Sequence, residues 1–307
     1  MSAAIEFQGV SKQYGAQRAV DSLTLSVPEG ACLGLIGANG AGKTTAFSMV
    51  CGFVRPTAGE IRVFGAPVRA GDPVPGLGVL PQDAILPPRW AVGAYLSYLA
   101  ELGGARDPRA EAERVLALVS LSQSWASHAG TLSHGMAKRV GIAQALLGSP
   151  RLVIFDEPTA GLDPRLAAET RALIRGFKGQ ATVVVSSHNL AELESLCDSA
   201  AILERGRLVG FGTMAELTGA SASFQIAYRG GVAPIDRLRL LEGCRSANAV
   251  SATAVELSTA GNAESVDELL TRALALMIAS RLTITGVQKG ASLEKRVLEL
   301  AGNPTTN

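Results

Sequence analysis

Apolar and polar residues alternate in two short stretches near the N-terminus, as in strands that bury one face. The first stretch contains Ile5 and Phe7, and the second contains Leu23, Leu25 and Val27. The turn-like segment SKQYGAQ separates them. The pattern therefore predicts two half-buried, antiparallel strands at the periphery of the fold.

Short runs made almost entirely of apolar residues follow, which is typical of strands buried on both faces of a parallel sheet. These runs are CLGLIG (32–37), RLVIF (151–155), ATVVVSS (181–187) and AAILE (200–204). Because helical patterns alternate with them, the sequence predicts a mainly parallel α/β core. Helical patterns dominate from about Trp90 to Gly148, so we expect a helical insertion at about residues 88–148.

The pattern changes after Leu217 to a looser alternation of strands and helices. We expect strands around Phe224 to Tyr228 and at LTITG, a helix at Leu238 and Leu241, and a hairpin over residues 250–257. A helix from about Glu264 and a last helix at SLEKRVLELAG (292–302) complete the expectation. The sequence thus predicts two domains: residues 1–219 and a small α+β domain, residues 220–307.

Composition removes several classes of function. The chain has 28 basic and 27 acidic residues and a formal net charge of +1, which does not indicate a nucleic-acid partner. Neither a signal peptide nor an apolar run close to the ~20 residues of a membrane span is visible, so we expect a cytoplasmic protein.

Cysteine and histidine spacing does not indicate a structural metal. The four cysteines lie far apart and form no CxxC pair, which fits a reducing compartment; they are Cys32, Cys51, Cys197 and Cys244. His128 and His134 have no cysteine or carboxylate at a ligand spacing.

A glycine loop follows the first apolar run and precedes a helical pattern. The segment GANGAGKTT matches G-x-x-x-x-G-K-[ST], in which glycines let backbone NH groups point at phosphate oxygens at the start of a helix. We expect Lys43 to reach the β and γ phosphates of a bound nucleotide and the Thr44 hydroxyl to bind Mg²⁺. The loop residues expected to contact the nucleotide are Gly37, Asn39, Gly40, Gly42, Lys43, Thr44 and Thr45.

Two carboxylates end the second apolar run, in RLVIFDEPTAGLDP. Parallel strands end at one edge of a sheet, so Asp156 and Glu157 should lie near the glycine loop. Asp156 directly follows the strand and is expected to hold Mg²⁺, whereas Glu157 is expected to act as general base on the attacking water.

In this order, the motifs resemble those of the ATP-binding subunits of ABC transporters over residues 1 to about 220. The resemblance implies a P-loop NTPase fold of the ABC type, with a mainly parallel core sheet, an antiparallel β subdomain and a helical insertion. It implies that Tyr14 stacks on adenine and that Gln82 touches Mg²⁺ and water. It also implies that Asp163 crosses a dimer interface and that His188 contacts the γ phosphate. Ordinary structural roles are the alternatives: a turn tyrosine, a surface glutamine and a helix N-cap.

The segment LSHGM (132–136) resembles the family signature LSGGQ. Leu132, Ser133 and Gly135 match the signature, whereas His134 and Met136 depart from it. The pattern also predicts a helix that begins after Ser133 and therefore presents free NH groups to an anion. By resemblance, Ser133 and Gly135 would face the γ phosphate held by an opposite subunit.

The resemblance implies two partners. A second ATP-binding subunit, expected to be another copy, would complete two ATP sites, and a separate membrane permease would dock between the Gln82 loop and the helical insertion. The chain would then lie on the cytoplasmic face of the inner (plasma) membrane. Trp90, Val92 and Tyr95 are either part of that docking surface or core of the insertion.

The last helical segment is similar to the C-terminal extension of drug, lipid or polysaccharide exporters, which implies export and an accessory or dimerisation domain. Two alternatives remain at this point: a regulatory or weakly hydrolysing subunit paired with a more active homologue, and an ABC ATPase without a membrane partner.

Overall fold

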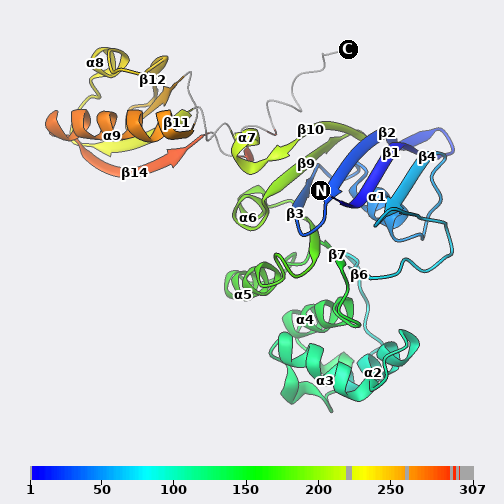
Figure 1. Ribbon diagram of the computed structural model, residues 1–307. Coiled ribbons are helices and arrows are strands. Elements are labelled where there is room, and N and C mark those ends of the chain that lie inside the picture. The colour runs from blue at the N-terminus through cyan, green and yellow to red at the C-terminus, as the bar shows by residue number, and fades with distance from the viewer. Residues whose placement is uncertain (1, 219–222, 260–262, 291–292, 295–296, 298–307) are drawn as a thin grey trace. The chain divides into compact units, whose positions relative to one another are not determined.

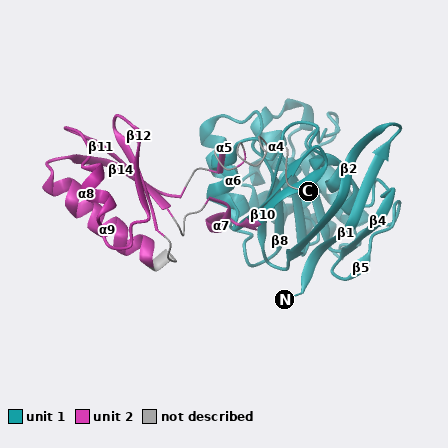
Figure 2. Cartoon of the chain, turned by 90° about the horizontal axis from the view of Figure 1, so that it is seen from above, with its two compact units in different colours: residues 1–211 teal, residues 212–307 magenta. Residues whose placement is uncertain are grey.

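The computed structural model describes residues 2–218, 223–259, 263–290, 293–294 and 297. The chain divides into two compact units, residues 1–211 and residues 212–307 (Figure 2). The boundary expected from the sequence, after residue 219, falls among residues outside this description. Each unit is described by itself below.

An antiparallel sheet opens the first unit. Strands β1 (Ala3–Tyr14) and β2 (Gln17–Pro28) pair in an antiparallel manner, which confirms the predicted pair. Both strands extend further than the alternation predicted, because much of the SKQYGAQ segment is itself strand. Strands β4 (Ala58–Val63) and β5 (Ala66–Pro67) complete the order β2-β1-β4-β5.

A second sheet of six strands, in the order β10-β9-β3-β8-β7-β6, forms the core (Figure 1). Its strands are β3 (Cys32–Ile36), β6 (Leu77–Leu80), β7 (Leu152–Asp156), β8 (Thr182–Ser186), β9 (Ser199–Glu204) and β10 (Arg207–Thr213). The β3–β8, β3–β9, β6–β7 and β7–β8 pairs are parallel. Every residue of β3, β7 and β8 is buried, which confirms the parallel core predicted from the apolar runs.

Three helices of the first unit follow core strands: α1 (Lys43–Val50), α5 (Pro164–Arg175) and α6 (Leu190–Leu196). Helix α1 packs in a core shared by the two sheets, where Phe47 joins Phe7, Leu25 and Ile154. The glycine loop before α1 is therefore anchored on both sides, by a buried strand and by a buried helix.

Helices also fill the segment between β6 and β7 (Figure 1). They are α2 (Val92–Leu102), α3 (Pro108–Leu118), α4 (His134–Ala145) and the 3₁₀ turns Ser122–Ser124 and Ala129–Thr131. Helix α3 begins after Asp107, whose side chain accepts a hydrogen bond from the NH group of Ala110, and α4 begins after Ser133. Local capping thus sets where these helices begin.

The second unit has the order β11 (Ser223–Arg229), α8 (Ile235–Arg239), β12 (Ser246–Ser251), β13 (Ala254–Ser258), α9 (Ala263–Ala279) and β14 (Thr283–Lys289), after a short helix α7 (Met214–Thr218). The sheet order is β12-β13-β11-β14 and the pairs are antiparallel. This is the split βαββαβ topology of ferredoxin-like domains. Its own core joins Phe224 and Tyr228 to Leu269 and Met277.

The predicted strands and helices of the second unit are present, but α8 is shorter than the pattern suggested. The predicted helix at 292–302 lies largely outside the described residues. Within the described part of the chain, none of the helices combines the length and apolar character that crossing a membrane requires.

Close packing of β6 on α4 leads to a test of how the insertion is anchored. A Cβ atom at Gly78 would lie 1.9 Å from the carbonyl oxygen of Ala145, the last residue of α4. We expect Gly78→Ala to lower the free energy of unfolding by about 1–3 kcal/mol or more, because backbone must shift. Gly103→Ala is the control, since its Cβ would meet its nearest atom at 3.4 Å. Urea unfolding measures both, and equal midpoints would contradict the proposed anchor.

Candidate functional site

The glycine loop between β3 and α1 has a backbone that requires glycine. Gly42 has φ of 104°, and a Cβ there would lie 2.5 Å from the carbonyl oxygen of Ala19. A Cβ at Gly37 would lie 2.7 Å from the carbonyl oxygen of Leu203. Gly40 has φ of 83° with open space beside it. The loop is therefore a tight cradle with one open side, which suits an anion bound by backbone NH groups.

Lys43 supplies a positive charge to this loop. It is the first residue of α1, and its buried side chain donates from Nζ to the carbonyl oxygens of Gly37, at 2.6 Å, and Ala38, at 3.3 Å. The start of α1 adds the partial positive charge of a helix N-terminus. Both features suit a polyphosphate ligand.

A cavity of about 390 Å³ opens beside the loop. This volume is within the range of small-molecule sites. Its lining joins four separate segments of the chain: Tyr14, Gln17, Ala19, Asn39, Gly40, Gly42, Lys43, Thr44, Thr45, Gln82 and Glu157. The structure thus brings most of the sequence-predicted nucleotide residues to one place.

Asp156, at the end of β7, meets the first turn of α1. Its Oδ2 accepts a hydrogen bond from Thr44 Oγ1 at 3.2 Å, and its Oδ1 accepts one from Ser186 Oγ. A buried carboxylate and an adjacent hydroxyl are the oxygen ligands that Mg²⁺ prefers. The residues present therefore fit a magnesium ion bound together with phosphate.

Glu157 and His188 form a pair beside this position. Glu157 follows β7, His188 follows the end of β8, and Glu157 Oε2 lies 2.8 Å from His188 Nδ1. The side chain of Glu157 is 8% exposed, whereas that of His188 is 72% exposed. Glu157 has φ of 52°, unusual for a residue other than glycine, and its NH donates to Ser186 Oγ at 3.0 Å. Such backbone strain is typical of functional positions.

Two residues of this region were not found by sequence reasoning. Ser186 joins Asp156 to the NH group of Glu157, and Lys138 on α4 approaches the backbone oxygen of Gln82, at 3.5 Å. Burial lowers the pKa of Lys138, although the nearby carboxylates, Asp156 first among them, oppose this shift. The only signal for Ser186 was its place at the end of an apolar run, and the sequence held no signal for Lys138.

The signature segment lies at the start of α4. Ser133 Oγ accepts a hydrogen bond from the NH group of Met136 at 3.3 Å, which confirms the predicted cap. Gly135 is buried, and a Cβ there would lie 2.5 Å from Leu166 Cδ1 on α5. A Cβ at Gly161 would lie 2.9 Å from His134 Nε2. His134, which differs from the family signature, therefore packs against the loop before α5.

Asp163 caps α5: its Oδ1 accepts hydrogen bonds from the NH groups of Arg165 and Leu166, both at 3.0 Å. Asp163, Ser133 and Gly135 are not among the described residues that line the cavity at Lys43. Within one chain, the described residues of the signature therefore add nothing to the lining of this cavity. In the part of the chain that is described, no three His, Cys, Asp or Glu side chains are grouped as a metal site.

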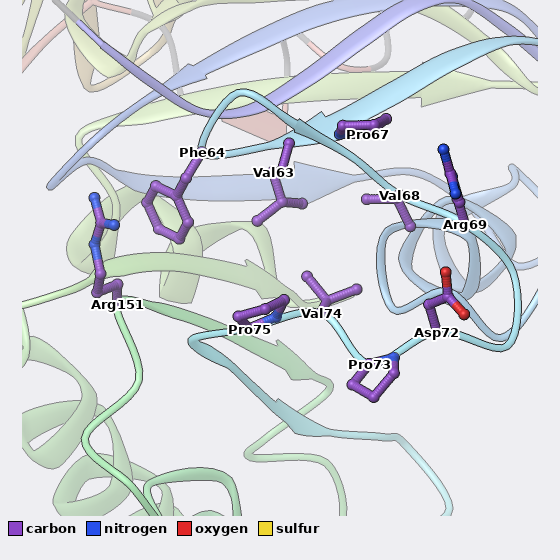
Figure 3. A pocket seen from close by; sticks show the side chains of 11 residues that line it. Val63, Phe64, Pro67, Val68, Arg69, Asp72, Pro73, Val74, Pro75 and Arg151 are labelled. Atoms are coloured by element: carbon purple, nitrogen blue, oxygen red, sulfur yellow. The ribbon is translucent and has the colours of Figure 1, made fainter.

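Another cavity of about 390 Å³ lies on the β4–β5 side of the molecule (Figure 3). Phe64, Val74, Pro75, Arg69 and Arg151 are among its lining residues, and the Arg151 guanidinium lies 3.9 Å from the centre of the Phe64 ring. Its lining includes none of the predicted site residues. We therefore place the candidate site at the glycine loop, where the charged and strained groups converge.

Trp90, Val92 and Tyr95 were expected to belong either to the permease-docking surface or to the core of the insertion, and they differ in burial. Val92 is fully buried, so the docking interpretation was wrong for it. Tyr95 is half-buried, and its hydroxyl lies 2.9 Å from Gln144 Oε1 on α4. Trp90 is exposed and packs on Tyr98 with ring centres 5.4 Å apart.

Comparisons with known proteins agree with the fold and the site. The family model described as "ABC transporter" matches residues 20–160. Nod factor export ATP-binding protein I of Rhizobium etli is 37% identical over 217 residues, which are 68% of this chain and 68% of that protein. The protein of the same name from Burkholderia orbicola is 37% identical over 218 residues, 68% of this chain and 71% of that one.

Solved structures give the same result. A structure described as the ATP-binding subunit of an ABC transporter has a TM-score of 0.62 and 31% identity, and covers 70% of this chain and 92% of that one. A bacterial Atm1-family ABC exporter with ATP bound has a TM-score of 0.63 and 25% identity, over 71% of this chain and 40% of that one. The fold and site thus define a P-loop nucleotide-binding protein, and the chain belongs to the family of ATP-binding subunits of ABC transporters.

The Ser186 bridge generates a prediction. Ser186→Ala leaves Asp156 Oδ1 and the NH group of Glu157 without their shared partner in a buried site. We expect a loss of about 1–3 kcal/mol in the free energy of unfolding. Thermal unfolding measures this loss, with the half-buried Ser97 of α2 changed to alanine as the control. Equal unfolding temperatures for the two variants would contradict a structural role for the bridge.

Proposed function

We propose that the chain is the ATP-hydrolysing subunit of an ABC exporter and that it acts as a homodimer on a separate membrane permease. The observation that carries this proposal is the cavity that joins Tyr14, Lys43, Thr44, Gln82 and Glu157. It combines a stacking ring, a phosphate loop, magnesium ligands and a base in one space. Each of these features serves phosphoryl transfer to water.

Within the proposal, the side chains divide the work. The loop and Lys43 bind the β and γ phosphates, and the ring of Tyr14 stacks on adenine. Thr44, Asp156 and Gln82 would hold Mg²⁺, which neutralises phosphate charge when bound. Glu157 takes the proton of the attacking water.

His188 contacts the γ phosphate in this proposal. His188 Nδ1 lies 2.8 Å from Glu157 Oε2. The rest of the imidazole ring is largely exposed and is therefore accessible to a bound phosphate.

The dimer rests on the separation of the two half-sites. The start of α4 presents free NH groups beside Ser133 and Gly135, and these two residues do not line the cavity at Lys43. A second copy, related by a twofold axis, would bring its own α4 to the first copy's γ phosphate. ATP then favours the closed pair, and hydrolysis removes that preference. Asp163 would lie at the interface.

Exposed apolar side chains that follow Gln82 along the chain support the permease. Ile85 is 87% exposed, and Trp90, Tyr98 and Leu102 are also exposed. Trp90 and Tyr98 pack together, and contiguous exposed apolar side chains are typical of interaction sites. We place the permease here, which puts the chain on the cytoplasmic face of the inner (plasma) membrane.

The names of the relatives support export, because those proteins are called Nod factor export ATP-binding proteins. The second unit lies outside the family match and has its own core, which supports an accessory role, including dimerisation. A transported substrate is not assigned.

Glu157→Gln tests this function. The amide keeps the size of the side chain but cannot accept the proton of water. We expect ATP binding within about twofold of wild type, a loss of phosphate release of at least about a hundredfold, and a dimer on gel filtration only with ATP.

Wild-type phosphate release by the variant would rule out Glu157 as the base. A wild-type chain that binds ATP yet does not hydrolyse it, even with its permease, would favour the regulatory subunit instead.

A further inference from the structure

Glu192 on α6 is a buried carboxylate without a role in the proposed chemistry. The residue is 5% exposed. Its Oε2 accepts hydrogen bonds from Thr159 Oγ1 at 2.8 Å and from Ser187 Oγ at 3.0 Å. Among the described residues, its buried Oε1 has no hydrogen-bond partner, and Arg171 Nη1 lies 3.9 Å from it. Burying a carboxylate is costly, so its specific contacts call for an explanation.

One of these contacts reaches the histidine of the site. Ser187, bound to Glu192 Oε2, directly precedes His188, and its Oγ also accepts from the NH group of Asn189 at 3.0 Å. Asn189 Oδ1 in turn accepts from the NH group of Glu192 at 3.2 Å. The residues on both sides of His188 are therefore tied to Glu192.

The other contact reaches the glutamate of the site. Thr159 lies two residues after Glu157, in the loop that leads from β7 to α5. The same oxygen atom of Glu192 thus joins the loop that carries Glu157 to the loop that carries His188. These two loops also carry the pair in which Glu157 Oε2 lies 2.8 Å from His188 Nδ1.

Packing around these loops is incomplete. A cavity of about 400 Å³ lies against them, and Thr159, His188, Asn189, Arg171 and Glu192 are among its lining residues. Loops beside a cavity lack the neighbouring atoms that fix side chains in a core. The hydrogen bonds to Glu192 therefore add a second tie between the two loops, beyond the one that Ser186 makes to the NH group of Glu157.

Helix capping does not explain the carboxylate. Asn189 already caps α6, because its side chain accepts from the NH group of Glu192. Both donors to Glu192 Oε2 come from other segments: Thr159 follows β7, and Ser187 follows β8. The carboxylate is placed to join loops rather than to start its own helix.

We infer that Glu192 is a positioning residue for ATP hydrolysis, which holds Glu157 and His188 at hydrogen-bonding distance by joining their loops. The inference rests on the proposed function of that pair. It assigns no contact between Glu192 and nucleotide, so loss of the brace should lower kcat while leaving nucleotide affinity intact.

Variants at position 192 give the test. Glu192→Ala removes the acceptor for both hydroxyls, and we expect kcat to fall by about tenfold or more with the Kd for ATP within about twofold. Glu192→Gln keeps a carbonyl oxygen that can accept from both hydroxyls, so it should retain most of kcat. Glu113→Gln, a surface glutamate paired with Arg109 on α3, is the matched control.

Two further variants keep the carboxylate and remove one donor each. Thr159→Val and Ser187→Ala should each lower kcat, by less than Glu192→Ala does. Their effects guard the test against misfolding of the alanine variant. Wild-type kcat in folded Glu192→Ala, or equal losses in Glu192→Ala and Glu192→Gln, would overturn the inference.

A readout without turnover separates the brace from the proposed function. The chain has only three histidines, so the imidazole resonances of His188 can be assigned by NMR with a His188→Gln variant. Glu192→Ala should shift them, whereas Glu113→Gln should not. If wild type shows no ATP hydrolysis even with its permease, the proposed function fails, and unshifted His188 resonances in Glu192→Ala would overturn the brace by themselves.

Discussion

Neighbouring parallel strands must end at the same edge of a sheet, and the candidate site depends on this constraint. Strand β3 leads into the glycine loop, β7 ends at Asp156 with Glu157 directly after it, and β8 ends two residues before His188. The order β3-β8-β7 makes these three ends adjacent. The glycine loop, two carboxylates and an imidazole therefore lie close together simply because they follow adjacent strand ends. Ligand sites in α/β proteins commonly form in this way.

Buried polar atoms then fix the spacing within that edge. Ser186 joins Asp156 to the backbone of Glu157, and Glu192 joins the loops on either side of the Glu157 and His188 pair. Hydrogen bonds among buried groups are costly to break, so they hold a geometry better than exposed contacts do. The described signature residues at the start of α4 do not line the cavity, and this observation motivates the proposed dimer.

Continuous apolar runs were sufficient to predict β3, β7, β8 and β9, because strands buried on both faces leave little choice of residue. The glycine loop was predictable because its backbone excludes other residues. Strands β4 to β6 and β10 were not predicted: they are short or half-exposed, and their alternation is weak. The pairing β12-β13-β11-β14 and the contacts of Ser186, Lys138 and Glu192 join distant segments, about which local pattern carries no information.

The central claim, that each chain holds complementary halves of an ATP site, is tested most directly by capture between two defective chains. Both chains carry Glu157→Gln. The first chain is tagged and carries Lys43→Ala, which removes the cation that binds the phosphates. The second chain is untagged and carries Ser133→Arg, whose bulky side chain prevents the signature from contacting the partner's ATP. A mixed pair still has one intact site, formed by Lys43 of the second chain and Ser133 of the first. The account predicts that the tagged chain retains the untagged one only with ATP, whereas neither variant pairs with itself. Absence of ATP-dependent capture, with both chains folded and Ser133→Arg still binding ATP, would contradict it.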